Sequence, residues 1–189
     1  MPVDLGKLLE ESGAILKGHF LLASGRHSDV YFEKFRILEQ PHVLSALCAE
    51  VAVHFADAGI ELVAGPTTGG IIIAFEVGRQ MGLPTRYAET VDGVKKLRRN
   101  AYVAPGTRVL IVDDVLTTGM SVLEAAEAVK AHGAVIAGIA VLIDRSVDFD
   151  PGVPFFAAYR VEAETYAPQE VPEWLARIPA TKPGTRASA

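Results

Sequence analysis

The run VLIVDDVLTTGMS at residues 109–121 decides the fold of this chain of 189 residues. It begins with apolar, partly β-branched residues that favour a buried strand, and this strand ends at two acids, Asp113 and Asp114. A short loop with two threonines and Gly119 follows, and then a helix begins. Since a helix N-terminus offers free backbone N–H groups and the positive end of its dipole, the loop predicts an anion site suited to a phosphate.

Apolar runs on both sides of this motif extend the pattern. They predict four strands, over 61–65, 108–113, 134–143 and 155–161. Apolar residues at helical spacing predict three helices, one after Pro41 and the others over 70–81 and 120–131. Near-continuous apolar strands are typical of sheets covered on both faces, so we expect an open, mostly parallel α/β sheet flanked by helices. Such sheets bind ligands beyond the carboxyl ends of their strands.

The two ends of the chain do not follow this alternation. Residues 14–40 contain short β-like pieces, and residues 162–189 are rich in proline. Half of all residues are apolar, which suits a packed core and excludes a disordered protein. We expect a single domain over 1–189, with a core of about 40–161 and a small hood from about 1–39 and 162–183.

Composition excludes several classes of function. The net charge of −5 gives no basic excess for nucleic acid or an anionic membrane surface. One cysteine, Cys48, cannot form an intrachain disulfide, and the five histidines show no metal-ligand spacing. The N-terminus does not resemble a signal peptide, and no apolar run is long enough to span a membrane. We therefore expect a soluble cytoplasmic protein with neither a nucleic-acid nor a membrane partner.

Two further segments carry candidate chemistry. AGPTTGGIIIA at 64–74 is a strand, a Gly/Thr loop and a helix start, which alone indicates an ordinary βα turn but beside 109–121 favours a second anion site. The basic segment, GVKKLRRN at 93–100, lies in a stretch from Arg86 to Arg108 with six basic residues and two acids. A run of charge is usually a solvated face, but its sign here also suits a polyphosphate.

The run at 109–121 is neither a P-loop nor a GxGxxG fingerprint, and it resembles the phosphoribosyl-pyrophosphate (PRPP) motif of the type I phosphoribosyltransferases. The resemblance implies that Asp113 and Asp114 hold the ribose hydroxyls and that Thr68 and Gly69 belong to a pyrophosphate loop. The residues that it places around the 5-phosphate are Val115, Leu116, Thr117, Thr118, Gly119, Met120 and Ser121.

In the same family a mobile loop at the place of the basic segment carries a catalytic lysine and closes over the active site of a neighbouring subunit. This implies a homodimer and a PRPP contact from the basic segment. The KxxKxHG pattern usual there is absent from this chain. Lys96 is taken as the catalytic lysine, and Lys95, Arg98 and Arg99 are its rivals.

A third segment concerns the base. GHFLLASGRHSDVYFEK at 18–34 resembles the N-terminal element of the orotate phosphoribosyltransferases. The resemblance implies that Tyr31, Phe32, Thr117 and Arg145 contact orotate, a planar anion suited to an aromatic face and a guanidinium fork. The alternatives are core packing for the two aromatics and an ion pair with the adjacent Asp144 for Arg145. Relatives often carry lysine where this chain has Ala23 and Gly69.

Together these resemblances imply transfer of the 5-phosphoribosyl group from PRPP to orotate, which gives orotidine 5′-monophosphate and pyrophosphate in the synthesis of UMP. They imply Mg²⁺ as the cofactor, held mostly by PRPP and water and at most by Asp113 and Asp114. The alternatives are a phosphoribosyltransferase for a purine or for uracil, and a non-catalytic PRPP-binding regulator. The motif at 109–121 is common to all of these, and only the 18–34 segment and Arg145 favour orotate.

Overall fold

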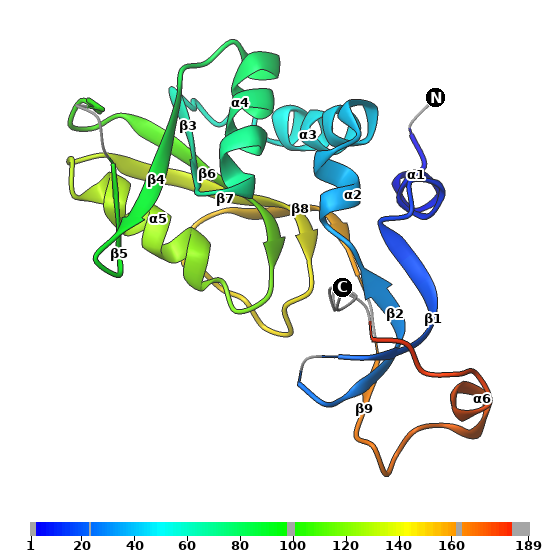
Figure 1. The fold of residues 1–189 in the computed structure, drawn as a ribbon. Coiled ribbons are helices and arrows are strands. Elements are labelled where there is room, and N and C mark those ends of the chain that lie inside the picture. The colour runs from blue at the N-terminus through cyan, green and yellow to red at the C-terminus, as the bar shows by residue number, and fades with distance from the viewer. Residues whose placement is uncertain (1–2, 23, 98–100, 162–163, 183–189) are drawn as a thin grey trace, which may run out of the picture.

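A six-stranded sheet forms the core of the computed structural model, which describes residues 3–22, 24–97, 101–161 and 164–182 (Figure 1). The strand order is β5-β4-β3-β6-β7-β8. The strands are β3 (Leu62–Pro66), β4 (Thr85–Val91), β5 (Val94–Leu97), β6 (Arg108–Leu116), β7 (Val135–Asp144) and β8 (Phe155–Arg160). All neighbours pair in parallel except β5, which is antiparallel to β4 at the edge. The prediction of an open, mostly parallel α/β sheet is confirmed.

Helices cover both faces of this sheet. They are α3 (Pro41–His54) and α4 (Gly69–Met81) on one face and α5 (Met120–Lys130) on the other. The central strand β6 shows why its residues from Val109 to Val112 are all apolar. Leu110 and Val112 pack with α3 and α4, whereas Val109 and Ile111 pack with α5, and all four are fully buried. Because successive side chains of a strand point to opposite faces, two helical layers require an apolar residue at every position.

The N- and C-terminal segments meet in a second, antiparallel sheet of order β1-β2-β9, as Figure 1 shows beside the core. Its strands are β1 (Ile15–Leu21), β2 (His27–Phe32) and β9 (Thr165–Tyr166), and the short helices nearby are α1 (Leu5–Glu11), α2 (Phe35–Leu38) and α6 (Glu173–Ala176). Arg26 donates from its guanidinium to the hydroxyl and the carbonyl of Thr165, so the two ends are tied together. In the part of the chain that the structure describes, no helix has both the length and the hydropathy to cross a bilayer.

The basic segment differs from the expected loop, because its described part forms a hairpin. β4 and β5 are joined at Asp92 and Gly93, which have φ values of 53° and 78°. An Asp-Gly pair with positive φ at both residues is typical of a type I′ turn, whose twist matches that of a two-residue hairpin. Lys95 and Lys96 therefore lie on a strand, while Arg98 and Arg99 lie outside the described residues.

A buried carboxylate joins α3 to α4. The Glu76 side chain on α4 accepts hydrogen bonds from Ser45 Oγ on α3 (2.6 Å), from the Arg79 guanidinium (2.7 and 2.8 Å) and from Gln80 Nε2 (2.7 Å). These bonds, the one with Arg79 first, lower the pKa of Glu76 to about 2 although burial acts in the opposite direction. The charged form of Glu76 is thus bound in the fold and fixes the two helices against each other.

We expect Glu76→Gln to lower the free energy of unfolding at pH 7 by about 1–3 kcal/mol, since it removes a hydrogen-bonded buried charge. A pKa held below its ordinary value stabilises the fold above about pH 4.5, and this stabilisation is lost as the pH falls towards 2. The difference from wild type should therefore shrink over that interval in urea denaturation. Glu127→Gln is the control, because its exposed pair with Lys130 is worth at most about 0.5 kcal/mol. Equal loss in both variants would contradict a special role for Glu76.

Candidate active site

The two acids of the motif lie inside β6, not beyond its end, because β6 stays paired with β7 as far as Leu116. Asp113 and Asp114 are 6% and 7% exposed. The Asp114 N–H donates to Asp113 Oδ1 at 2.9 Å, and the Val115 N–H donates to Asp114 Oδ1 at 2.7 Å. Strand alternation points the two carboxylates to opposite faces of the sheet. As a result they face two different cavities.

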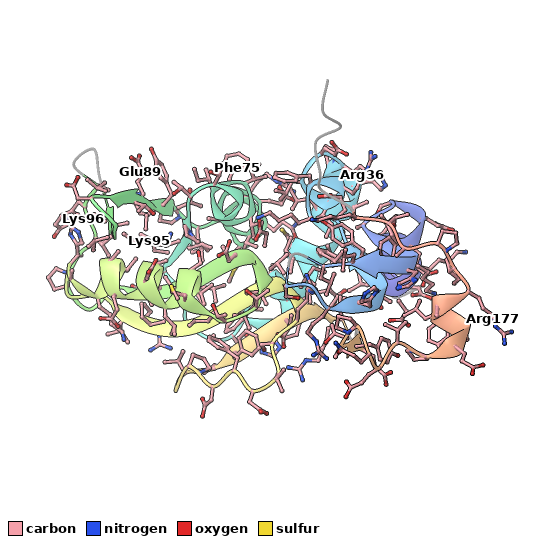
Figure 2. All side chains as sticks on the ribbon, turned by 60° about the horizontal axis from the view of Figure 1, so that its bottom comes forward. Arg36, Phe75, Glu89, Lys95, Lys96 and Arg177 are labelled. Carbon is pink, nitrogen blue, oxygen red and sulfur yellow. The ribbon has the colours of Figure 1, made fainter. Side chains whose placement is uncertain are left out.

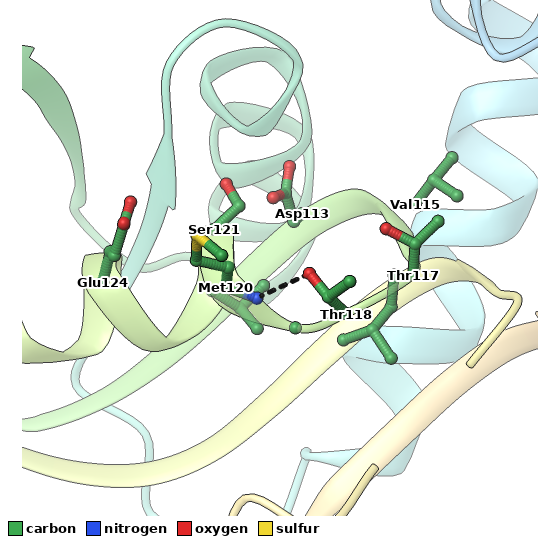
Figure 3. Close-up of a pocket in the computed structure, with 10 residues that line it drawn as sticks. Asp113, Val115, Thr117, Thr118, Met120, Ser121 and Glu124 are labelled. Carbon is green, nitrogen blue, oxygen red and sulfur yellow. Dashed lines mark hydrogen bonds between the residues drawn. The ribbon is translucent and has the colours of Figure 1, made fainter. Parts of the chain in front are cut away.

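Asp113 faces the β6–α5 cavity, a hollow of about 270 Å³ at the N-terminus of α5 (Figure 3). Its lining includes the predicted phosphate residues from Val115 to Ser121. Gly119 is required here, since its φ is 79° and a Cβ atom would lie 2.1 Å from the ring of Phe149. Thr118 Oγ1 accepts from the Met120 N–H at 3.4 Å, drawn as a dashed line in Figure 3. Hydroxyls and the start of a helix thus surround a space suited to an anion.

Asp114 faces the Lys34 cavity, a hollow of about 410 Å³ between the β3–α4 turn (residues 66–69) and α2. Thr68 and Gly69 of this turn line it, as the sequence predicted for a second loop beside the first. A Cβ atom on Gly69 would lie 2.2 Å from Asp114 Oδ2, so a side chain at this position would require the Asp114 carboxylate to shift. The two loops of the sequence analysis therefore meet at the acid pair.

Lys34 is a residue of this site that the sequence analysis missed. Its Nζ lies 3.0 Å from Asp114 Oδ2, and its side chain is 44% exposed to the Lys34 cavity. Lys34 follows β2 and precedes α2, so the hood brings it to the core. Its position two residues after Phe32, in a segment already selected, was the available signal.

The acid pair is electrostatically unfavourable, which is a sign of function rather than of packing. Burial, and after it the charge of Asp114, raises the pKa of Asp113 to about 6. Hydrogen bonds from the Asp114 backbone and from Ser121 act in the opposite direction but do not compensate. The fold therefore holds an ionised acid at neutral pH where water solvates it poorly.

The candidate base residues do not share one surface. Phe32 is 6% exposed and belongs to the main core, which is the packing alternative. Tyr31 points to the other face of β2 and contacts the ring of Phe20, with 5.6 Å between centroids. Because neighbours on a strand alternate, the two aromatics cannot form a common wall. Thr117 is exposed at the carboxyl end of β6.

Arg145 begins the segment after β7, and its backbone N–H donates to the Leu116 carbonyl at 2.9 Å, so it lies beside the end of β6. The alternative for Arg145 was an ion pair with Asp144. That carboxylate is fully buried and is bound instead by Arg160 (2.7 and 3.0 Å) and by Ser146. Since Asp144 is occupied in this way, the Arg145 side chain is not committed to it.

The two described lysines of the basic segment differ in exposure. The Lys95 side chain is 8% exposed, and its Nζ lies 3.9 Å from Glu124 Oε2 on α5. Lys96, in contrast, is exposed. Figure 2 shows Lys95, Lys96 and Glu89 together at one end of the molecule, well apart from Arg36, the second residue of α2. The basic segment therefore does not reach the Lys34 cavity with its described residues.

Known proteins share this arrangement. Residues 37–151 match the family described as the phosphoribosyl transferase domain. Orotate phosphoribosyltransferases from Pelotomaculum thermopropionicum and Chlorobaculum parvum are 46% and 44% identical, covering 97% and 96% of this chain and 97% and 95% of theirs. The crystal structure of orotate phosphoribosyltransferase from Aeropyrum pernix matches with a TM-score of 0.69 and 28% identity, covering 83% of this chain and 93% of the other. The fold is thus that of a type I phosphoribosyltransferase. Within that class, the chain belongs to the orotate phosphoribosyltransferase family, whose members act in pyrimidine biosynthesis.

We expect Asp113→Asn to be more stable than wild type at pH 8, by up to about 3 kcal/mol, because it removes a poorly solvated charge. A raised pKa costs stability above about pH 6, and this cost disappears as the pH falls from 6 towards 3.8. The advantage of the variant should shrink over that interval in metal-free denaturation experiments. Asp57→Asn, at an exposed acid, is the matched control and should change little. A variant less stable than wild type at pH 8 would show that Asp113 is a structural acid.

Proposed function

We propose that this chain transfers the 5-phosphoribosyl group from PRPP to orotate, giving orotidine 5′-monophosphate and pyrophosphate. The observation that carries the proposal is the acid pair of β6, which stands between two anion-compatible loops. In this proposal the ribose hydroxyls donate to Asp113 and Asp114. The 5-phosphate takes the β6–α5 cavity, lined by Val115, Leu116, Thr117, Thr118, Gly119, Met120 and Ser121. The pyrophosphate lies towards Thr68 and Gly69.

Mg²⁺ is the proposed cofactor, and the donor set can be tested against it. Carboxylate oxygens suit this hard ion, but in the part of the chain that the structure describes no cluster of three acidic, histidine or cysteine side chains forms a cage. The residues fit an ion held chiefly by PRPP and water, with Asp113 or Asp114 as its protein contacts. Bound there, Mg²⁺ neutralises charge on the pyrophosphate.

Positioning and charge are what the chain itself has to supply. The C1–O bond of PRPP breaks through a transition state with oxocarbenium character, and the orotate ring nitrogen reacts as an anion without a strong base. The Arg145 guanidinium and the Thr117 hydroxyl, both at the carboxyl end of the central strands, are proposed to orient orotate. Tyr31 is proposed as an aromatic contact, and Phe32 supports it from the core side of β2.

Substrate choice tests the proposal directly. Purified protein with PRPP and Mg²⁺ should consume orotate and leave uracil, hypoxanthine and adenine unchanged. Arg145→Ala should reduce kcat/KM for orotate by about 1.5–3 kcal/mol in activation free energy, chiefly through KM, as a charged hydrogen bond is lost. Arg177→Ala is the matched control, since this exposed arginine, directly after α6, pairs only with Glu173 among the described residues. Consumption of a purine with orotate left intact would overturn the assignment.

A homodimer that shares the basic segment is part of the proposal. Its support is the exposed position of Lys96 away from the Lys34 cavity, together with apolar side chains at the rim of that cavity. Phe35 and Ile72 of this rim, and Phe75 one turn further along α4, are 62%, 42% and 63% exposed, which suits a face covered by a second subunit. Lys96 is proposed as the catalytic lysine, and Lys95, Arg98 and Arg99 as further PRPP contacts. One domain with a hood, located in the cytoplasm, completes the proposal.

Subunit mixing tests the shared segment. A Lys96→Ala subunit and an Asp114→Asn subunit should each be nearly inactive alone. In a mixed dimer one site inherits both changes and the other neither, so activity should recover to about half of wild type if the sites are independent. A verified heterodimer without recovery would mean that the basic segment acts on its own subunit or that Lys96 is not the catalytic lysine. Repeating the test with Lys95→Ala in place of Lys96→Ala distinguishes these two outcomes.

A further inference from the structure

The Lys34–Asp114 contact is the feature of the site that the proposed function leaves unexplained. Asp114 is assigned to ribose hydroxyls, yet in the free protein its Oδ2 is bound by Lys34 Nζ at 3.0 Å. An ammonium has three N–H donors, and this contact uses one of them. The remaining donors belong to a side chain that lines the Lys34 cavity and is 44% exposed to it.

The opposite wall of that cavity explains why a cation is placed there. Thr68 and Gly69 line the same hollow as Lys34, and the turn at residues 66–69, Pro-Thr-Thr-Gly, has no charged side chain. A polyphosphate group at the β3–α4 turn therefore finds no charge on that turn itself. The only other ionised groups that line the cavity within the described residues are acids, Glu39 and Asp114, and Glu39 is paired with Arg36 at 3.1 Å.

We propose that Lys34 binds the pyrophosphate group of PRPP, so that the hood supplies the cation that the β3–α4 turn lacks. This inference rests on the proposed function and adds a substrate contact to it. In the free protein Lys34 neutralises the buried Asp114 carboxylate. When ribose hydroxyls donate to Asp114, the Lys34 ammonium lies between that carboxylate and the pyrophosphate, and it can serve both.

The binding of magnesium pyrophosphate, measured by calorimetry, tests this contact apart from catalysis. Lys34→Met should raise the Kd of magnesium pyrophosphate by about 10- to 100-fold, the usual loss for a charged hydrogen bond. Ribose 5-phosphate should lose much less affinity than pyrophosphate, because its phosphate takes the β6–α5 cavity on the other face and only its hydroxyls meet Asp114. Lys34→Arg should retain most of the pyrophosphate affinity.

Lys17→Met is the matched control, because Lys17 is another hood lysine in an ion pair, with Glu10 at 2.5 Å, and it does not line the Lys34 cavity. It should bind pyrophosphate as wild type does. The Asp114→Asn background separates a direct contact from an effect through Asp114. If Lys34 contacts pyrophosphate directly, adding Lys34→Met to Asp114→Asn should raise the Kd of magnesium pyrophosphate by a similar factor as in the wild-type background. If Lys34 acts only through Asp114, adding Lys34→Met to Asp114→Asn should leave that Kd unchanged.

Each result decides one question. Wild-type pyrophosphate affinity in Lys34→Met, or disappearance of the cost in the Asp114→Asn background, would overturn the role of Lys34 while orotate turnover by wild type upholds the proposed function. Loss of pyrophosphate affinity in a protein that consumes a different base would support Lys34 and overturn orotate. A wild-type protein that binds neither PRPP nor pyrophosphate would overturn both.

Discussion

The alternation of side chains along β6 is the constraint on which the site depends. The strand is buried by α3 and α4 on one face and by α5 on the other, so its residues from Val109 to Val112 are apolar on both. At its carboxyl end the same alternation continues with Asp113 and Asp114. The two adjacent carboxylates thereby point to opposite faces of one strand, and each lines its own cavity. A ligand with two anionic ends joined by a hydroxylated ring matches this geometry.

Holding both acids in a strand has an energetic cost that the rest of the site reduces. The backbone N–H groups of Asp114 and Val115 each bind a carboxylate, and Lys34 neutralises Asp114. Burial raises the pKa of Asp113 to about 6, although the charge of Lys34 acts in the opposite direction. Poor solvation makes both acids strong acceptors for hydroxyl groups that arrive with a substrate. A pair of apolar residues at positions 113 and 114 would stabilise the fold more than two acids do. Ligand binding therefore explains the acid pair better than fold stability does.

The sequence was sufficient for most of the core, where elements follow from burial alone, but it gave no range for β4, which is only partly buried. Continuous apolar runs predicted β3, β6, β7 and β8, and apolar stripes predicted α3, α4 and α5. It was not sufficient where tertiary contacts decide. The Asp92-Gly93 pair indicates a hairpin turn, but the positive charge of the basic segment favoured a loop, so β5 was not predicted. The side of β2 to which Phe32 points depends on the hood's register, and Lys34 reaches Asp114 across 80 residues, which no local pattern reveals.

The distribution of cations follows from these contacts. The β3–α4 turn has no charged side chain, so it can bind an anion only through its backbone and its hydroxyls. Charge has to arrive from other segments, and the structure offers Lys34 from the hood and Lys96 from the sheet edge. Neither segment is part of the sheet's carboxyl-end loops. Because Arg26 and Thr165 tie the hood's two halves together, a change in the C-terminal segment can act on Lys34 through β2. In the proposed binding mode the hood is a part of the anion site rather than a cover over it.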